Sequence, residues 1–282
     1  MRLEPIDLLH QGRERTIASY VVDTDDGPAL FDCGPATTID ALKAGLDRHG
    51  LHLTDVRHLL LSHIHLDHAG AAGVLVREHP GLQVHVSGIG APHLVDPSRL
   101  ERSARRLYGD SFDTLWGELA PVPEANVHVA GERVLGLECF PTPGHASHHV
   151  CYLDRDGTLY SGDAAGVRID PGRFVLPPTP PPEFDLDAWQ ATLEELEARA
   201  PERMALIHWG VFDDVQRHLA DLRLELYEWA DFIRGGAGLD EFTEYVKLEL
   251  RDAGEDTGHY DLAMPLWQSY QGLKRWAERR QP

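Results

Sequence analysis

The stretch Ser62-His63-Ile64-His65-Leu66-Asp67-His68 decides how this sequence is interpreted. It follows residues 57–61, which we predict as a short buried strand, and precedes residues 69–79, which we predict as a helix. A loop between a strand and a helix can direct short side chains toward one point. The side chains in it that can offer a nitrogen or an oxygen to a metal ion are His63, His65, Asp67 and His68. The stretch therefore predicts a metal site rather than a solvated polar loop.

Three later segments place similar side chains after predicted strands. Thr142-Pro143-Gly144-His145 presents a histidine after a glycine turn, and Ser161-Gly162-Asp163 presents a carboxylate. Leu206-Ile207-His208-Trp209-Gly210 presents another histidine at the end of a strand. Each segment alone is weak, because a histidine at a strand end usually serves a structural hydrogen bond. Together with residues 62–68 they form a complete set of metal-ligand candidates.

In their order along the chain, these motifs resemble the metallo-β-lactamase superfamily of binuclear metallohydrolases. The similarity runs from residue 63 to residue 208, and Phe31-Asp32-Cys33-Gly34 before it also resembles the family. The resemblance implies an α/β fold, a four-layer αββα sandwich, here followed by a C-terminal helical extension. A helical extension in that position is similar to the glyoxalase II branch of thioesterases, and a lactonase-like branch is an alternative.

The resemblance also implies roles for seven residues. The first metal would be bound by His63, His65 and His145, and the second by Asp67, His68 and His208. Asp163 would bridge the two metals, and Asp67 would in addition act in catalysis by orienting the attacking hydroxide. Imidazole and carboxylate ligands without a thiolate suit Zn²⁺, but also iron, manganese or cobalt. We favour two zinc ions, with iron or manganese as the alternatives, sharing a bridging hydroxide of lowered pKa as the nucleophile.

Further residues are candidates for supporting the ligands or lining the pocket. Asp32 is either an acceptor for a ligand imidazole or an ordinary turn carboxylate. His149 matches a structural histidine of the family, and the additional His148 either lines the pocket or has a structural role. Arg168 and Arg173 are either partners for a substrate anion or solvated surface residues.

Two segments are expected to shape the substrate site. We predict a catalytic core over residues 1–210 with an insertion at 88–125, and a helical extension over residues 211–282. Both segments carry aromatic residues, such as Tyr108 in the insertion, that either wall the site or pack the core.

The periodicity of apolar residues predicts the remaining elements. We expect strands at residues 17–22, 28–33, 82–86, 126–129, 133–140, 149–153, 158–161 and 204–207. We expect helices at residues 36–49, from Pro97, at 112–119, at 187–198 and over most of the chain from Val211 onward.

Composition narrows the class of substrate. The formal net charge of −20 repels nucleic acids, so we expect a small-molecule substrate and no nucleic-acid partner. The sequence predicts neither a membrane span nor a targeting segment, so a cytoplasmic location is expected. A homo-oligomer is compatible with the sequence.

The leading functional hypothesis is a binuclear metal-dependent hydrolase that uses a metal-bridging hydroxide on a small ester, thioester or lactone. One alternative keeps the site and changes the bond to a phosphodiester or a phosphonate ester. Another is a sensor or scaffold that holds metal without catalysis.

Overall fold

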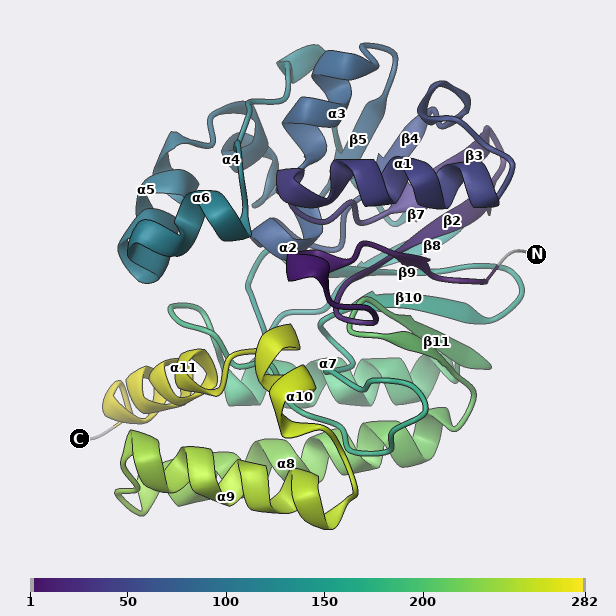
Figure 1. Cartoon of the computed structure of the whole chain (residues 1–282). Coiled ribbons are helices and arrows are strands. Elements are labelled where there is room, and N and C mark those ends of the chain that lie inside the picture. The colour runs from purple at the N-terminus through teal and green to yellow at the C-terminus, as the bar shows by residue number, and fades with distance from the viewer. Residues whose placement is uncertain (1–2, 281–282) are drawn as a thin grey trace.

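Two mixed β-sheets pack face to face at the centre of the molecule, and helices cover both outer faces (Figure 1). The computed structural model describes residues 3–280. In these residues, the strands of the first sheet are β1 (Ile6–Asp7), β2 (Ala18–Thr24), β3 (Gly27–Phe31), β4 (His58–Leu60), β5 (Gln83–Val86) and β6 (Val127–Val129), in that spatial order. The strands of the second sheet are β7 (Arg133–Val134), β8 (Leu137–Pro141), β9 (Val150–Leu153), β10 (Thr158–Gly162), β11 (Arg203–Leu206) and β12 (Gly210–Phe212).

The helices form the two outer layers and an additional group at the C-terminal end. The first part of the chain contributes α1 (Ile39–Arg48), α2 (Leu66–Ala69), α3 (Ala72–Glu78), α4 (Ala91–Val95), α5 (Ser98–Tyr108) and α6 (Phe112–Leu115). The second part contributes α7 (Leu186–Arg199), α8 (Val215–Arg234), α9 (Leu239–Asp252), α10 (Thr257–Ala263) and α11 (Leu266–Glu278). The 3-10 turns are η1 (His10–Gly12), η2 (Ala36–Thr38), η3 (Leu53–Asp55), η4 (Gly109–Ser111) and η5 (Glu124–Asn126). This arrangement confirms the predicted αββα sandwich followed by C-terminal helices.

Aromatic residues fill the space between the sheets. The ring of Phe31 on β3 lies 6.0 Å from the ring of Tyr152 and 5.4 Å from the ring of Tyr160, both on the second sheet. The Tyr20 hydroxyl donates to the Leu206 carbonyl at 2.7 Å, so a hydrogen bond also joins the sheets. Such edge-to-face aromatic packing adds to the free energy gained by burying the rings. The inner core therefore fixes how the two sheets are placed relative to each other.

Several element boundaries differ from the sequence prediction. The predicted strand at residues 133–140 is a hairpin, because Leu135 and Gly136 adopt positive φ angles and turn the chain between β7 and β8. The segment from Val211, predicted to be mostly helical, starts inside strand β12, which pairs antiparallel with β11, and becomes helical only at α8. The helix predicted at residues 112–119 ends at Leu115. No helix of residues 3–280 is long and apolar enough to span a membrane.

Three glutamates meet where α8 packs near α9. Carboxylate oxygens of Glu225, Glu228 and Glu249 lie within 4.8 Å of one another. Burial, together with the charges of Glu249 and Glu228, raises the pKa of Glu225 to about 8. Because this folded-state pKa exceeds the value of about 4.3 expected for an unfolded chain, ionisation of Glu225 disfavours the folded state as pH rises.

We expect Glu225→Gln to stabilise the protein above pH 5, with a gain that grows as pH rises to about 8 and then levels off. The gain should be about 1 kcal/mol, because partial exposure screens the effect. Urea unfolding at pH 5, 6.5 and 8 measures it. Glu244→Gln on the exposed face of α9 is the control, and it should show no such dependence. A gain from Glu225→Gln that is equal at all three pH values would contradict the prediction.

Candidate metal centre

The ligand candidates lie on loops that follow the carboxyl ends of strands from both sheets. His63 and His65 follow β4, and His145 follows β8. Asp163 comes directly after β10, and His208 comes two residues after β11. The sequence indicated that Asp67 and His68 lie in the loop before a helix. In the structure they lie in the first turn of α2 instead. The structure therefore brings all seven candidates from four segments to one edge of the sandwich.

The first group of donor atoms contains His63, His65, His145 and Asp163, whose potential ligand atoms lie within 4.8 Å of one another. The Nδ1 atom of His65 lies 2.9 Å from Nε2 of His63 and 2.9 Å from Nε2 of His145. Oδ2 of Asp163 lies 3.2 Å from Nε2 of His145. Four donor atoms at these separations can surround one cation in the manner of a tetrahedral site.

The second group contains Asp67, His68 and His208. Oδ2 of Asp67 lies 3.6 Å from Nε2 of His68 and 3.4 Å from Nε2 of His208. Oδ1 of Asp163 lies 3.3 Å from the same His68 atom and 3.7 Å from the same His208 atom. The two oxygens of Asp163 therefore face different groups, as a carboxylate that bridges two cations would.

Hydrogen bonds fix the outward-facing nitrogen of four of these imidazoles. His145 Nδ1 donates to the Pro178 carbonyl at 2.8 Å, and His208 Nδ1 donates to the Thr16 carbonyl at 2.8 Å. His63 Nδ1 lies 2.9 Å from the hydroxyl of Ser62, which itself donates to Asp32. His68 Nδ1 lies 2.7 Å from Oδ2 of Asp32. With Nδ1 held as a donor, Nε2 of each ring faces the centre, where it can bind a metal when it carries no proton.

The electrostatics of the two groups differ. Burial lowers the pKa of His63 and of His65 well below the usual value, so both rings are held in the neutral form that binds metal. For His68, burial acts in the same direction, but the carboxylates of Asp163, Asp67 and Asp32 outweigh it and raise the pKa well above the usual value. Burial disfavours ionisation of Asp163, yet His68 and His145 hold its pKa well below the usual range.

These donors fit a pair of divalent cations. Nε2 of His68 and Oδ1 of Asp163 are buried and have no hydrogen-bond partner, although they lie only 3.3 Å apart. Unpaired polar atoms in a protein interior are costly unless a ligand or an ion satisfies them. A cation between them would satisfy both atoms and would replace the proton that the carboxylates otherwise hold on His68.

A glycine allows the loops to approach each other this closely. Gly162, directly before Asp163, has a φ angle of +50°. A Cβ atom at this position would lie 2.5 Å from Cβ of Ser62 and 2.6 Å from Nε2 of His149. Glycine is therefore needed before Asp163 for two reasons: the positive φ angle, and the close approach of Ser62 and His149, which both support the centre.

Asp32, His148 and His149 all lie beside the centre. Asp32 is fully buried and accepts hydrogen bonds from the Ser62 amide and hydroxyl as well as from His68. His149 is a structural residue, because its ring bridges the Thr142 hydroxyl at 2.7 Å and the Asp163 amide at 3.1 Å. The ring of His148 stacks on the ring of His63 at 5.8 Å, and its Nδ1 atom has no partner.

The two arginines have different surroundings in the structure. Arg168 is buried, donates to Asp214 at 2.7 Å and covers the ring of Phe212. It therefore holds the segment after Asp163 against β12, and it is not the solvated surface residue that was one of the two alternatives. Arg173 is exposed, and its backbone amide donates to Glu255. Tyr108 packs against the buried cluster that contains Leu66, the residue between His65 and Asp67. Burial, and then the negative charge of Asp67, raise the pKa of its hydroxyl.

The sequence did not identify several residues that contact or flank the centre. His10, in η1, is buried, and this burial lowers its pKa. The charge of Asp67 raises the same pKa, and the charge of His208 lowers it. No ligand motif surrounds His10 in the sequence, so no signal pointed to it. The proline-rich segment at residues 177–182 supplies the Pro178 carbonyl that orients His145. Gln268 on α11 accepts a hydrogen bond from the Tyr108 hydroxyl at 3.3 Å.

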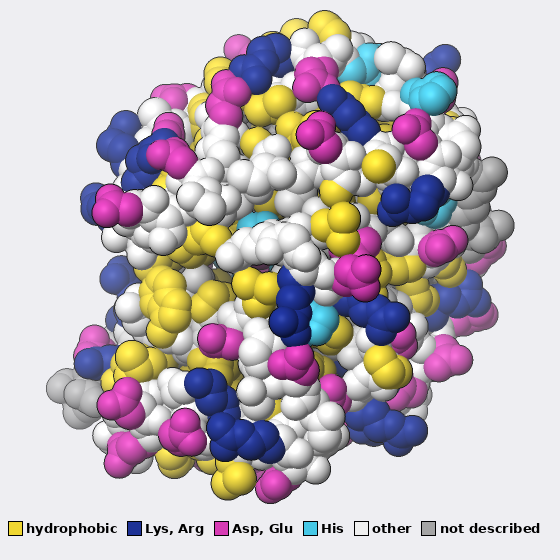
Figure 2. Space-filling model, viewed as in Figure 1, with side chains coloured by type: hydrophobic (Ala, Val, Ile, Leu, Met, Phe, Trp, Pro, Cys, Tyr) yellow, Lys and Arg dark blue, Asp and Glu magenta, His cyan; other side chains and the backbone are white. Residues whose placement is uncertain are grey.

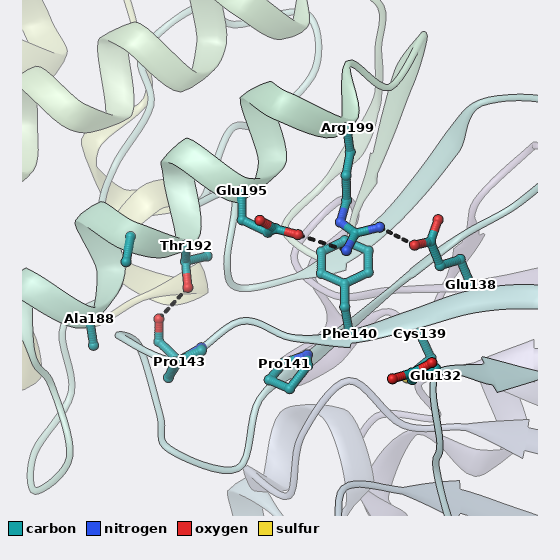
Figure 3. A pocket seen from close by; sticks show the side chains of 11 residues that line it. Glu132, Glu138, Cys139, Phe140, Pro141, Pro143, Ala188, Thr192, Glu195 and Arg199 are labelled. Atoms are coloured by element: carbon teal, nitrogen blue, oxygen red, sulfur yellow. Dashed lines mark hydrogen bonds and ion pairs between the residues drawn. The ribbon is translucent and has the colours of Figure 1, made fainter.

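A separate hollow lies on the outer face of the second sheet, between β8 and α7 (Figure 3). Its volume is about 550 Å³. Arg199 spans it, stacking on Phe140 and pairing with Glu138 and Glu195. The lining residues include none of the seven ligand candidates, and Arg199 pairs with two of the three glutamates that line the hollow. This hollow is therefore not part of the candidate metal centre.

The family is established by comparison with known proteins. A family model described as the metallo-beta-lactamase superfamily matches residues 12–208, which is well over half of the chain. The chain therefore belongs to the metallo-β-lactamase superfamily, as its motifs predicted. Members of this superfamily are mostly metal-dependent hydrolases, and this chain carries the corresponding cluster of histidines and aspartates.

Curated relatives are similar to part of the chain. It is 29% identical over 191 residues to a probable metallo-hydrolase of Mycobacterium tuberculosis, covering 56% of this chain and 59% of that protein. It is 24% identical over 202 residues to an atrochrysone carboxyl ACP thioesterase of Cryptosporiopsis, covering 70% and 50%. The chain spans less than two thirds of the length of these curated relatives.

Solved structures share the fold. A metallo-beta-lactamase family protein from Thermus thermophilus superposes with a TM-score of 0.65 at 20% identity, covering 93% of this chain and 88% of that one. The protein TTHA1623, solved in a di-iron-bound form, superposes with a TM-score of 0.55 at 26% identity, covering 73% and 91%.

Replacing Asp32 by Asn should weaken metal binding about 10- to 100-fold, because His68 loses the charged acceptor that orients its ring. Calorimetric titration of chelator-treated protein with Zn²⁺ measures the affinity. Asp26→Asn is a matched control, because Asp26 pairs with His58 at 2.9 Å at the opposite end of β3. Equal affinities for Asp32→Asn and the parent protein would show that this hydrogen bond does not support the centre.

Proposed function

We propose that the protein is a binuclear metal-dependent hydrolase that cleaves a small ester, thioester or lactone. The observation that supports the proposal most strongly is the position of Asp163, whose two carboxylate oxygens face the two separate groups of donors. Two divalent ions bound there would supply Lewis acidity and a water molecule acidic enough to attack at neutral pH. We propose zinc as the metal, with iron or manganese as alternatives, because the donors are nitrogen and oxygen only.

The chain's own residues have distinct tasks in this proposal. Asp67 is the most exposed carboxylate of the centre, with 22% of its side chain accessible, whereas that of Asp163 is 4% accessible. Asp67 therefore faces the side from which a substrate arrives, and we assign it the orientation of the attacking water. His63, His145 and His208 hold the centre rigidly through their fixed outward hydrogen bonds.

Two observations favour ester and thioester bonds. One relative is named as a thioesterase that acts on an acyl carrier protein substrate. The strongly negative chain is also poorly suited to polyanionic substrates, which argues against a nuclease-like phosphodiesterase. A metal-holding scaffold without catalysis is the remaining alternative, and the partial exposure of Asp67 argues for an accessible reacting group instead.

Replacing His63 or Asp163 by Ala should remove bound metal and lower hydrolysis by at least a thousandfold, because each substitution removes one of the proposed metal ligands. Elemental analysis gives the metal content. Initial rates with thioesters, lactones and bis(4-nitrophenyl) phosphate give the activity on each bond type. His128→Ala, on the exposed end of the first sheet, is the matched control and should leave metal and activity unchanged.

The outcomes separate the alternatives. Hydrolysis that survives complete metal removal would refute the proposal. A preference for the phosphate diester by orders of magnitude would support the phosphodiesterase alternative, and turnover of no substrate with two metals bound would support the scaffold.

A further inference from the structure

Three segments that are distant in the sequence meet beside the metal centre and form what we call the aromatic wall. Its members are His10 of η1, Tyr108 at the end of α5, Trp116 after α6 and Trp267 of α11. In Figure 1, α5 and α6 lie above and α11 lies below on the same side of α2. Figure 2 shows hydrophobic side chains gathered between these two halves of the molecule.

The rings of the wall contact one another in sequence. The ring of His10 stacks on the ring of Trp116 with centroids 5.4 Å apart and planes 16° apart. Tyr108 packs edge-on against Trp116 at 5.1 Å and against Trp267 at 6.4 Å. The Tyr108 hydroxyl donates to the buried side chain of Gln268. These contacts hold the insertion and the C-terminal helix together around one continuous set of aromatic rings.

The wall directly adjoins the reacting groups. Leu66, which lies between His65 and Asp67, belongs to a buried cluster with Ala104 and Phe112, and Tyr108 and Trp116 pack against this cluster. Burial is the main cause of both pKa shifts: it lowers the pKa of His10 and raises the pKa of Tyr108. The negative charge of Asp67 raises both pKa values. Through Leu66, the wall therefore adjoins the segment that carries His65 and Asp67.

Two polar atoms of the wall lack partners. Nδ1 of His10 and Nε1 of Trp116 are buried, and neither makes a hydrogen bond to any described residue. The indole Nε1 atom can only donate, so it requires an acceptor such as a carbonyl, phenol or carboxylate oxygen. Because buried donors are rarely left unpaired, the two stacked rings point to a ligand that carries oxygen.

From this arrangement we infer that the wall binds the acyl part of the substrate, and that this part is a flat aromatic acyl group bearing an oxygen substituent. The inference rests on the proposed hydrolase function and makes its substrate class narrower. An aromatic ring would pack against the exposed edges and faces of the wall, while Trp116 donates to the oxygen. A flexible alkyl chain would fill the same space but would leave the indole N–H unpaired.

The test compares acyl groups on one leaving group, N-acetylcysteamine: hexanoyl, benzoyl and the three hydroxybenzoyl isomers. For each substrate, the ratio of kcat/KM between parent protein and variant cancels the substrate's intrinsic reactivity. Trp116→Leu should lower kcat/KM about tenfold for the best hydroxybenzoyl thioester, and less than twofold for hexanoyl. Trp116→Phe keeps a ring without the N–H, so it should keep the preference for benzoyl over hexanoyl and lose the advantage of the hydroxyl.

Tyr227→Leu, an exposed position on α8, is the control and should change no ratio. Metal content and Tm of each variant show whether it is folded and loaded. An equal loss for hexanoyl and aromatic substrates, or a larger loss for hexanoyl, would overturn the inference while leaving the hydrolase proposal intact.

A binding measurement separates this inference from the proposed function. Calorimetric titration with hydroxybenzoates and with hexanoate requires no turnover. We expect tighter binding of one hydroxybenzoate than of hexanoate, and loss of that difference in Trp116→Leu. If no thioester is hydrolysed but this binding pattern is found, the hydrolase proposal fails and the aromatic site stands. If thioesters are hydrolysed and hexanoate binds at least as tightly, the aromatic site fails alone.

Discussion

Burial of the Asp163 carboxylate among imidazoles is the constraint on which the rest of this structure depends. An ion in a protein interior is costly unless opposite charges and hydrogen bonds compensate for lost water. Asp163 is 3% exposed, and its compensation comes from His68, His145 and His208 on three different segments. These segments follow strands of both sheets, so neither sheet can shift relative to the other without leaving this charge uncompensated.

The supporting interactions extend that constraint outward into the backbone. Main-chain carbonyls of Thr16 and Pro178 accept from ligand histidines, although neither residue type suggests a metal site. Because Gly162 has no side chain, Ser62 and His149 can both lie against its backbone. Backbone carbonyls and the missing Cβ of Gly162 thus set much of the ligand geometry. The residue types at these positions give little indication of that role.

This explains how far the sequence predicted the structure. The motif at residues 62–68 and the later histidines predicted which residues gather at the centre, because ligand chemistry is a local property. The family resemblance that these motifs carry implied the sandwich, and the predicted strand pattern agrees with it. Arg168 was not predictable, because its role depends on Asp214, which lies 46 residues away and precedes a helix. His10 was missed for the same reason, since its stacking partner Trp116 lies on a different segment. Both roles arise from contacts between segments that no local pattern encodes.

The centre and the aromatic wall follow different physical rules, and this difference bears on how specificity can change. The ligand loops are tied to both sheets, so a substitution there disturbs the buried charges of Asp163 and His68 together. The wall is built from η1, the segment around α5 and α6, and α11, and it contributes no ligand atom. Its rings are held by packing and by the hydrogen bond between Tyr108 and Gln268. Exchanging one ring for another therefore alters which acyl group fits while the donors remain in place, which separates substrate choice from the chemistry of the centre.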